Sequence, residues 1–149
     1  MEIAITKGQR DDAIAITRDD GSAVATRFPH KGPVPHDAVH YFVERRLALR
    51  DAFWGQVARG MHPEDIAAMA KAGGHASAKR ADIPDAAIVE MIQAERLVEC
   101  FEADLWSGGG TDSDLLAVAA AGCAASKVPM LVVDPNAIGR IRGEIAQFA

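Results

Sequence analysis

The sequence predicts a single α+β domain, in which an N-terminal three-stranded antiparallel meander is followed by five or six helices that pack on one side of the sheet. Three observations lead to this fold class. The first 28 residues alternate apolar and polar side chains, the chain beyond residue 35 spaces its apolar side chains as helices do, and no linker divides the 149 residues. A chain of this length buries roughly 70% of its unfolded surface, which is enough for one sizeable core.

Three short segments near the N-terminus have the pattern of half-buried strands. Their apolar side chains stand at alternate positions: Ile3 and Ile5, Ile14 and Ile16, then Val24 and Phe28 around Thr26. The Asp19-Asp20-Gly21 segment lies between the second and third of them and predicts a tight turn, because glycine readily adopts a positive φ. An antiparallel meander is the simplest arrangement of these segments.

Helical periodicity begins after a connector that contains three prolines, residues 29–35. We predict six helices, at residues 36–49, 51–60, 63–72, 84–106, 112–126 and 134–148. Between the third and fourth, residues 73–80 are small and polar without periodicity, which is typical of a surface loop.

Composition excludes several classes of protein. The 21 acidic and 16 basic residues give a net charge of -5, without the clustered positive charge that a nucleic-acid partner requires. The longest uncharged stretch of the C-terminal half, Leu115 to Ser126, is much shorter than the roughly 20 residues that cross a bilayer. The N-terminal residues lack the pattern of a secretion signal, so we expect a cytoplasmic protein, with Cys100 and Cys123 as buried free thiols.

The first predicted helix carries the residues most suggestive of chemistry. His36, His40 and Glu44 recur every fourth position, so they occupy one strip of the helix about 80° wide. Two imidazoles one turn apart, with a carboxylate one turn later, have the spacing of ligands for zinc or another divalent transition metal. Asp37 and Glu44 are then the candidate catalytic residues for metal-assisted hydrolysis, since either could accept a proton from a metal-bound water.

This pattern is similar to the His-Glu-x-x-His helix of zinc metalloproteases, but Asp37 replaces the glutamate. Its side chain is one methylene shorter, and no further ligand motif follows at a familiar distance. A peptidase assignment is therefore not supported.

A structural interpretation of the same helix competes with the metal site. Val39, Val43 and Leu47 share the arc of the two histidines, so this face is expected to enter the core. Buried histidines are commonly hydrogen-bonded to carboxylates or carbonyls without any ion. On this interpretation the histidines and Glu44 fix the helix in a non-catalytic ligand-binding or protein-interaction domain.

The fourth predicted helix places Glu95, Glu99 and Glu102 inside its apolar arc. Carboxylates rarely face a core without a partner. One of them could complete the metal site, and we take Glu99 as the fourth ligand beside His36, His40 and Glu44. The alternative is that these acids form ion pairs with Arg45, Arg46 or Arg50.

Three segments together resemble a small family of uncharacterised bacterial proteins: Val34-Pro35-His36-Asp37-Ala38-Val39-His40 with Glu44, Phe53-Trp54-Gly55, and Ala94-Glu95-Arg96-Leu97-Val98. In that family a short strand meander precedes a Pro-His-Asp-x-x-His helix. The resemblance implies a shared fold and makes the histidine helix a family feature, and it implies no activity.

Three functions remain open from the sequence. The first is a metal-binding protein, with hydrolysis as its expected chemistry. The second is the non-catalytic domain, expected to self-associate as a homo-oligomer. The third is a regulatory protein that uses the protonation of His36 and His40 as a pH switch.

Overall fold

The computed structural model describes residues 1–73 and 83–149, and it confirms the α+β class. The strands are β1 (Glu2–Thr6), β2 (Asp11–Thr17) and β3 (Ala23–Pro29). The helices of the described residues are α1 (His36–Arg46), α2 (Phe53–Ala58), α3 (Pro63–Ala72), the 3₁₀ turn η1 (Ala86–Ile88), α4 (Val89–Ser107), α5 (Asp112–Ala125) and α6 (Pro135–Phe148). Apart from Gly73, the surface loop predicted for residues 73–80 lies outside the described residues.

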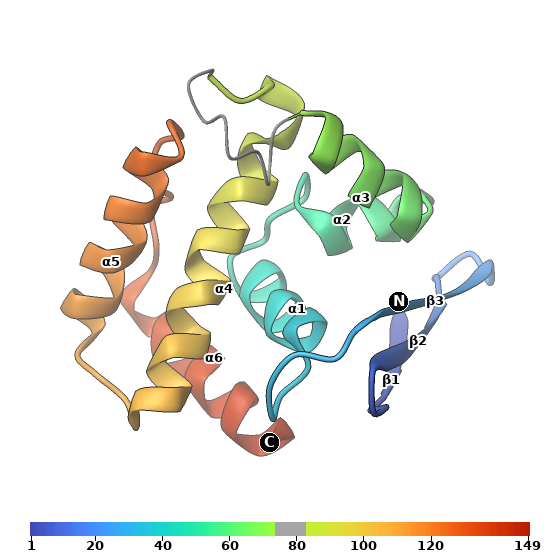
Figure 1. The fold of residues 1–149 in the computed structure, drawn as a ribbon, viewed down its shortest axis with the longest axis horizontal. Coiled ribbons are helices and arrows are strands. Elements are labelled where there is room, and N and C mark those ends of the chain that lie inside the picture. Colours follow the sequence, from blue (N-terminus) through green and yellow to red (C-terminus); the bar gives the residue numbers. More distant parts are fainter. Residues whose placement is uncertain (74–82) are drawn as a thin grey trace.

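The three strands form an antiparallel sheet in the order β1-β2-β3, as predicted. The register places Ile3 opposite Ile16 and Ile5 opposite Ile14, and Ile16 faces Val24 across the other edge of β2. Because directly opposed side chains point to the same face, this register collects the apolar side chains on one side of the sheet. The sheet lies at one end of the molecule with the helices on one side of it (Figure 1).

All six predicted helices are present, and the first and the fourth differ most from the prediction, by three or more residues at one end, while the other ends agree to within two residues. The first ends at Arg46 rather than at residue 49, because Ala48 adopts the left-handed conformation (φ 53°) and the N–H of Leu49 turns back to the carbonyl of Glu44. The fourth begins at Val89, after a separate 3₁₀ turn that is capped by the Asp85 side chain, which accepts the backbone N–H of Ala87.

The core has two main parts, which meet around α1 and α4. Thirteen buried residues of the first part join α1, α4, α5 and α6, with Val39, Val43 and Phe101 near its centre. The second part lies between the sheet and helices α2, α3 and α4, and includes Ile14 and Ile16. Helix α1 packs against α4, α6 and α2. Because other helices cover it on several sides, its polar side chains also contact neighbouring helices.

Two sequence expectations about single features are settled by the fold. Cys100 and Cys123 are both buried and both free, as predicted. None of the helices in the described part of the chain combines the length and the apolar character that a bilayer-spanning helix requires.

Candidate metal centre

His36 and His40 lie side by side on the face of α1 that turns toward α4. Their ring centroids are 4.7 Å apart and the rings meet edge to face at 75°. The neighbouring Val39 and Val43 are fully buried, which confirms that this side of α1 enters the core. The two imidazoles therefore stand at the border between the core and the surface, with about 15% and 11% of their side chains exposed.

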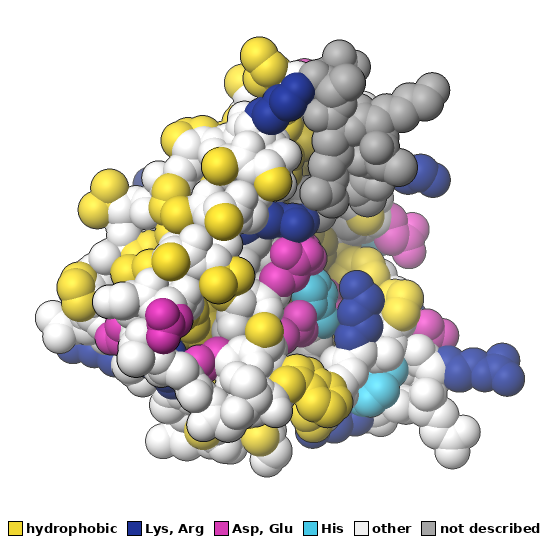
Figure 2. Space-filling view, turned by 60° about the vertical axis from the view of Figure 1, so that its left-hand side comes forward, with side chains coloured by type: hydrophobic (Ala, Val, Ile, Leu, Met, Phe, Trp, Pro, Cys, Tyr) yellow, Lys and Arg dark blue, Asp and Glu magenta, His cyan; other side chains and the backbone are white. Residues whose placement is uncertain are grey.

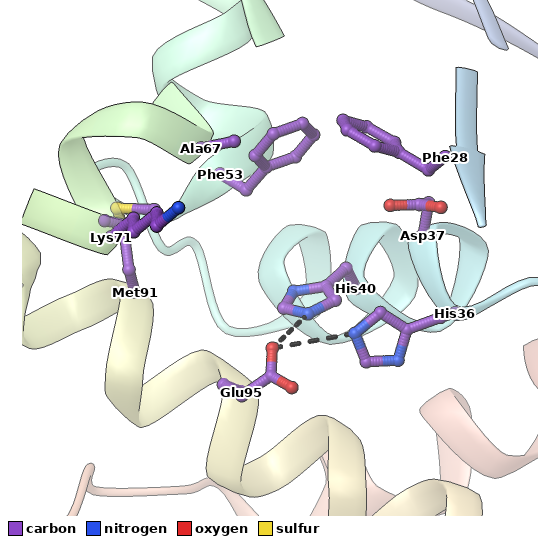
Figure 3. Close-up of a pocket in the computed structure, with 10 residues that line it drawn as sticks. Phe28, His36, Asp37, His40, Phe53, Ala67, Lys71, Met91 and Glu95 are labelled. Carbon is purple, nitrogen blue, oxygen red and sulfur yellow. Dashed lines mark hydrogen bonds and ion pairs between the residues drawn. The ribbon is translucent and has the colours of Figure 1, made fainter. Parts of the chain in front are cut away.

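A single carboxylate from α4 lies between the two rings. Oε2 of Glu95 is 2.9 Å from Nε2 of His40 and 3.6 Å from Nε2 of His36 (Figure 3). The donor atoms of the three residues all lie within 4.8 Å of one another, so this group could hold a metal ion. A nitrogen of each ring thus lies near the same oxygen of Glu95, on the facing helix α4.

The remaining nitrogen of each ring is held by a second carboxylate. Nδ1 of His36 donates to Glu102 at 2.8 Å, and Nδ1 of His40 donates to Glu44 at 3.0 Å. Glu44 is only 2% exposed, and its other oxygen accepts the backbone N–H of Trp54 at 2.7 Å. The first turn of α2 therefore fixes Glu44, and Glu44 in turn fixes the orientation of the His40 ring.

The structure brings together only part of the predicted ligand set. Glu44 contacts the far nitrogen of His40 and does not belong to the group of three donor atoms. Glu99 is likewise not a member of that group: its carboxylate lies 3.0 Å from the guanidinium of Arg96, with about half of the side chain exposed. Of the arginines suggested as partners for the acids of α4, Arg46 pairs with Glu144 on α6 instead.

Helix geometry explains why Glu95 and Glu102 face α1 and Glu99 does not. Residues seven apart differ by about 20° around a helix, whereas residues four apart differ by about 40°. Glu95 and Glu102 therefore align on the line of α4 that contacts α1, and Glu99 is turned away toward Arg96. The sequence indicated this site only through the presence of glutamates in an apolar arc. Identifying which of these glutamates face α1 required knowing which side of α4 packs against α1.

The carboxylates around the rings favour the imidazolium state. Burial opposes protonation of His40, but Glu44 and Glu95 outweigh it and raise its pKa to about 10. For His36 burial is likewise outweighed by Glu102 and Glu95, and its pKa rises to about 8. Burial also works against ionisation of Glu95, yet the two imidazoles hold its pKa well below the usual range of a carboxyl.

The metal group forms one side of a cavity of about 570 Å³. Its other walls come from the sheet and from α1, α2, α3 and α4: Phe28, Asp37, Phe53, Ala67, Ala70, Lys71 and Met91. Asp37 is the predicted catalytic residue that lies on this cavity, and desolvation raises the pKa of its carboxyl. In the space-filling view, acidic side chains lie directly beside a histidine on the face shown (Figure 2).

Comparison of the chain with family models, with curated proteins and with solved structures finds no match. The fold and the geometry of the site thus define the class of protein: an α+β domain with a histidine and carboxylate group at the edge of a cavity. The resemblance to an uncharacterised bacterial family stays a prediction.

Proposed function

We propose that this protein binds one divalent transition metal ion, with zinc as the first candidate, through Nε2 of His36, Nε2 of His40 and the carboxylate of Glu95. The observation that carries the proposal is the convergence of these three donor atoms within 4.8 Å at the wall of a cavity. Imidazole nitrogen and carboxylate oxygen are ordinary zinc ligands, and two histidines with one glutamate are a ligand set used by catalytic zinc sites.

The spacing of the donor atoms supports an ion of this kind. Ligands about 2.0–2.1 Å from a tetrahedral zinc ion stand about 3.3 Å from one another. The two distances from Glu95 to the rings, 2.9 and 3.6 Å, lie on either side of that value. The coordination also requires the two ring nitrogens, which lie within 4.8 Å of each other, to stand about 3.3 Å apart.

The outer carboxylates support the proposal independently. A metal-bound imidazole usually donates its second N–H to a carboxylate or a carbonyl, which sets the ring orientation and the tautomer. Glu102 and Glu44 already accept from Nδ1 of His36 and His40, so both Nε2 atoms face the shared point. A divalent ion that replaces the protons on these two Nε2 atoms leaves the charge of the cluster unchanged.

Metal-assisted hydrolysis is the chemistry that we propose for the bound ion. Three protein ligands leave a position of a tetrahedral ion for water, and zinc lowers the pKa of such a water to about 7. Asp37 is the proposed proton acceptor because its carboxyl lies on the same cavity as the donor group. Glu44 is buried behind His40, so its proposed role is to orient that ring rather than to accept the proton.

Metal analysis of protein purified without an affinity tag tests the proposal. We expect about one equivalent of metal, or of Zn²⁺ after treatment with chelator and reconstitution, in the parent protein. The His36→Ala/His40→Ala variant and the milder Glu95→Gln variant should lose it. His62→Asn is a matched control, since His62 caps α3 away from the site and asparagine keeps a capping acceptor. Equal, near-zero metal in parent and variants would overturn the proposal.

One observation favours the second candidate function, a non-catalytic ligand-binding or protein-interaction domain. Each of the four ring nitrogens already lies near a carboxylate, so the network of His36, His40 and three glutamates is satisfied by protons alone. On this candidate the network only locks α1 to α4. Chelator would then leave the melting temperature of the parent unchanged, whereas loss of a bound ion would lower it.

A further inference from the structure

Two charged side chains face each other across the cavity above the metal group. Lys71 of α3 and Asp37 of α1 lie on opposite sides of it, with His36, His40 and Glu95 between them at the base (Figure 3). None of the ion pairs among the described residues involves Lys71, so its ammonium is available to a molecule in the cavity. The Asp37 carboxyl interacts electrostatically with His36, His40 and Lys31.

The wall above the metal group is aromatic and apolar. Phe28 of β3 and Phe53 at the start of α2 meet edge to face with their ring centroids 5.8 Å apart. Met91 and the small side chains of Ala67 and Ala70 continue this wall from α4 and α3. Such a surface favours a flat apolar group, which gains both burial and edge contacts with the two rings.

We infer that this cavity takes a small organic anion that carries an aromatic or similarly flat apolar group. Its anionic group, a carboxylate by preference, pairs with Lys71, and its apolar group packs on Phe28 and Phe53. The claim that this anion is the substrate of the hydrolysis rests on the proposed function. Binding of the anion itself requires only the cavity. Asp37 repels the anionic group from the opposite side and so sets the orientation of the molecule.

Lys71 makes the cavity suitable for an anionic group. The two imidazoles of the lining already lie beside the carboxylates of Glu95, Glu102 and Glu44, whereas the ammonium of Lys71 forms no ion pair among the described residues. A single lysine suits one carboxylate. A polyphosphate requires several cationic groups, and no arginine belongs to the described lining of this cavity. The volume of about 570 Å³ lies within the range of pockets for small organic molecules.

Three probe molecules separate the two parts of this recognition. 3-Phenylpropionate has both groups, 3-phenylpropionamide keeps the ring without the charge, and propionate keeps the charge without the ring. Calorimetric titrations of the metal-free and the Zn²⁺-loaded parent should give 3-phenylpropionate the tightest binding, about tenfold tighter than the amide. Propionate should bind more weakly than 3-phenylpropionate by a similar factor.

Single-residue variants test which side chains cause the preference for the carboxylate over the amide. Lys71→Met should bring the ratio of carboxylate to amide affinity close to one without weakening the amide, and Lys71→Arg should keep the preference. Asp37→Asn should strengthen binding of 3-phenylpropionate several-fold. Arg140→Gln removes one positive charge from the exposed surface of α6, and it should change none of the affinities.

Two results would overturn the inference: equal affinity of the parent for the carboxylate and the amide, or an unchanged preference in Lys71→Met. A preference that survives Lys71→Met and disappears on removal of Zn²⁺ would show that the carboxylate binds the ion itself. The metal analysis tests the proposed function separately, because an absence of bound Zn²⁺ would contradict it. The titrations of the metal-free protein would then still test whether the cavity binds the anion.

Discussion

Binding of a divalent ion at His36 and His40 should release about two protons at pH 6. Only the neutral imidazole is a ligand, and the pKa values of about 8 and about 10 mean that both rings are imidazolium at this pH. Their Nε2 protons must leave when the ion binds. Because the released protons come from raised pKa values, affinity for the ion rises as the pH rises.

The size of the effect follows from the same two pKa values. At pH 7, protonation of His36 reduces the apparent affinity about tenfold and protonation of His40 about a thousandfold, which together amount to about 10⁴. Between pH 6 and pH 7 the affinity should therefore rise by about two orders of magnitude. Above pH 8 only His40 still carries its extra proton, so the slope should fall to about tenfold per pH unit.

Calorimetric titration of metal-free protein with Zn²⁺ in buffers of different ionisation enthalpy counts the protons released. Glu102→Gln is the informative variant, because it removes the carboxylate that does most to raise the pKa of His36. At pH 7 we expect this variant to release fewer protons than the parent, by on the order of half a proton or more. A bound water that ionises near pH 7 adds equally to both counts, so the difference survives it.

Release of fewer than one proton by the parent at pH 6 would refute the reasoning, and so would an identical count in Glu102→Gln at pH 7. The first result would mean that the two rings are not imidazolium in the metal-free protein. The second would mean that Glu102 does not control the protonation of His36.

Three further predictions concern stability. Because the pKa values of His36 and His40 are raised in the folded chain, their protonation stabilises the fold fully below pH 6.5. This stabilisation is lost as the pH rises through about 8 and about 10, so the melting temperature of metal-free protein should fall between pH 6.5 and pH 9.5. A flat or rising melting temperature over this range would contradict the prediction. Glu44→Gln should cost about 2–4 kcal/mol in urea unfolding, because the amide cannot accept from both His40 and the backbone N–H of Trp54; a loss below about 1 kcal/mol would contradict this. Gly55→Ala should cost about 2 kcal/mol or more, since its Cβ would overlap the carbonyl oxygen of Arg50. The control Gly139→Ala, with open space around it, should stabilise the protein by about 0.5–1 kcal/mol. Similar melting temperatures for the two alanine variants would argue against this assignment of the close contact.

Much of the fold could be predicted because it depends on local periodicity. Alternation places Ile14 and Ile16 on one face of a strand whatever the partner strands are, and helical spacing buries Val39 and Val43 in the same way. Helix boundaries were harder to predict where a residue adopts a backbone conformation that is unusual for its type. Ala48 ends α1 by adopting a positive φ, and no pattern in the sequence predicts this.

The sequence by itself determined that His36 and His40 share one strip of a helix, because four residues make about one turn, and that α4 carries acids in its apolar arc. Only the tertiary structure decided which acids reach the rings. The line along which α4 packs on α1 brings Glu95 and Glu102 to the imidazoles and leaves Glu99 with Arg96, and the entry to α2 supplies the N–H that holds Glu44. Sequence spacing fixes the positions of side chains around one helix, but the contacts between helices depend on how the whole core packs.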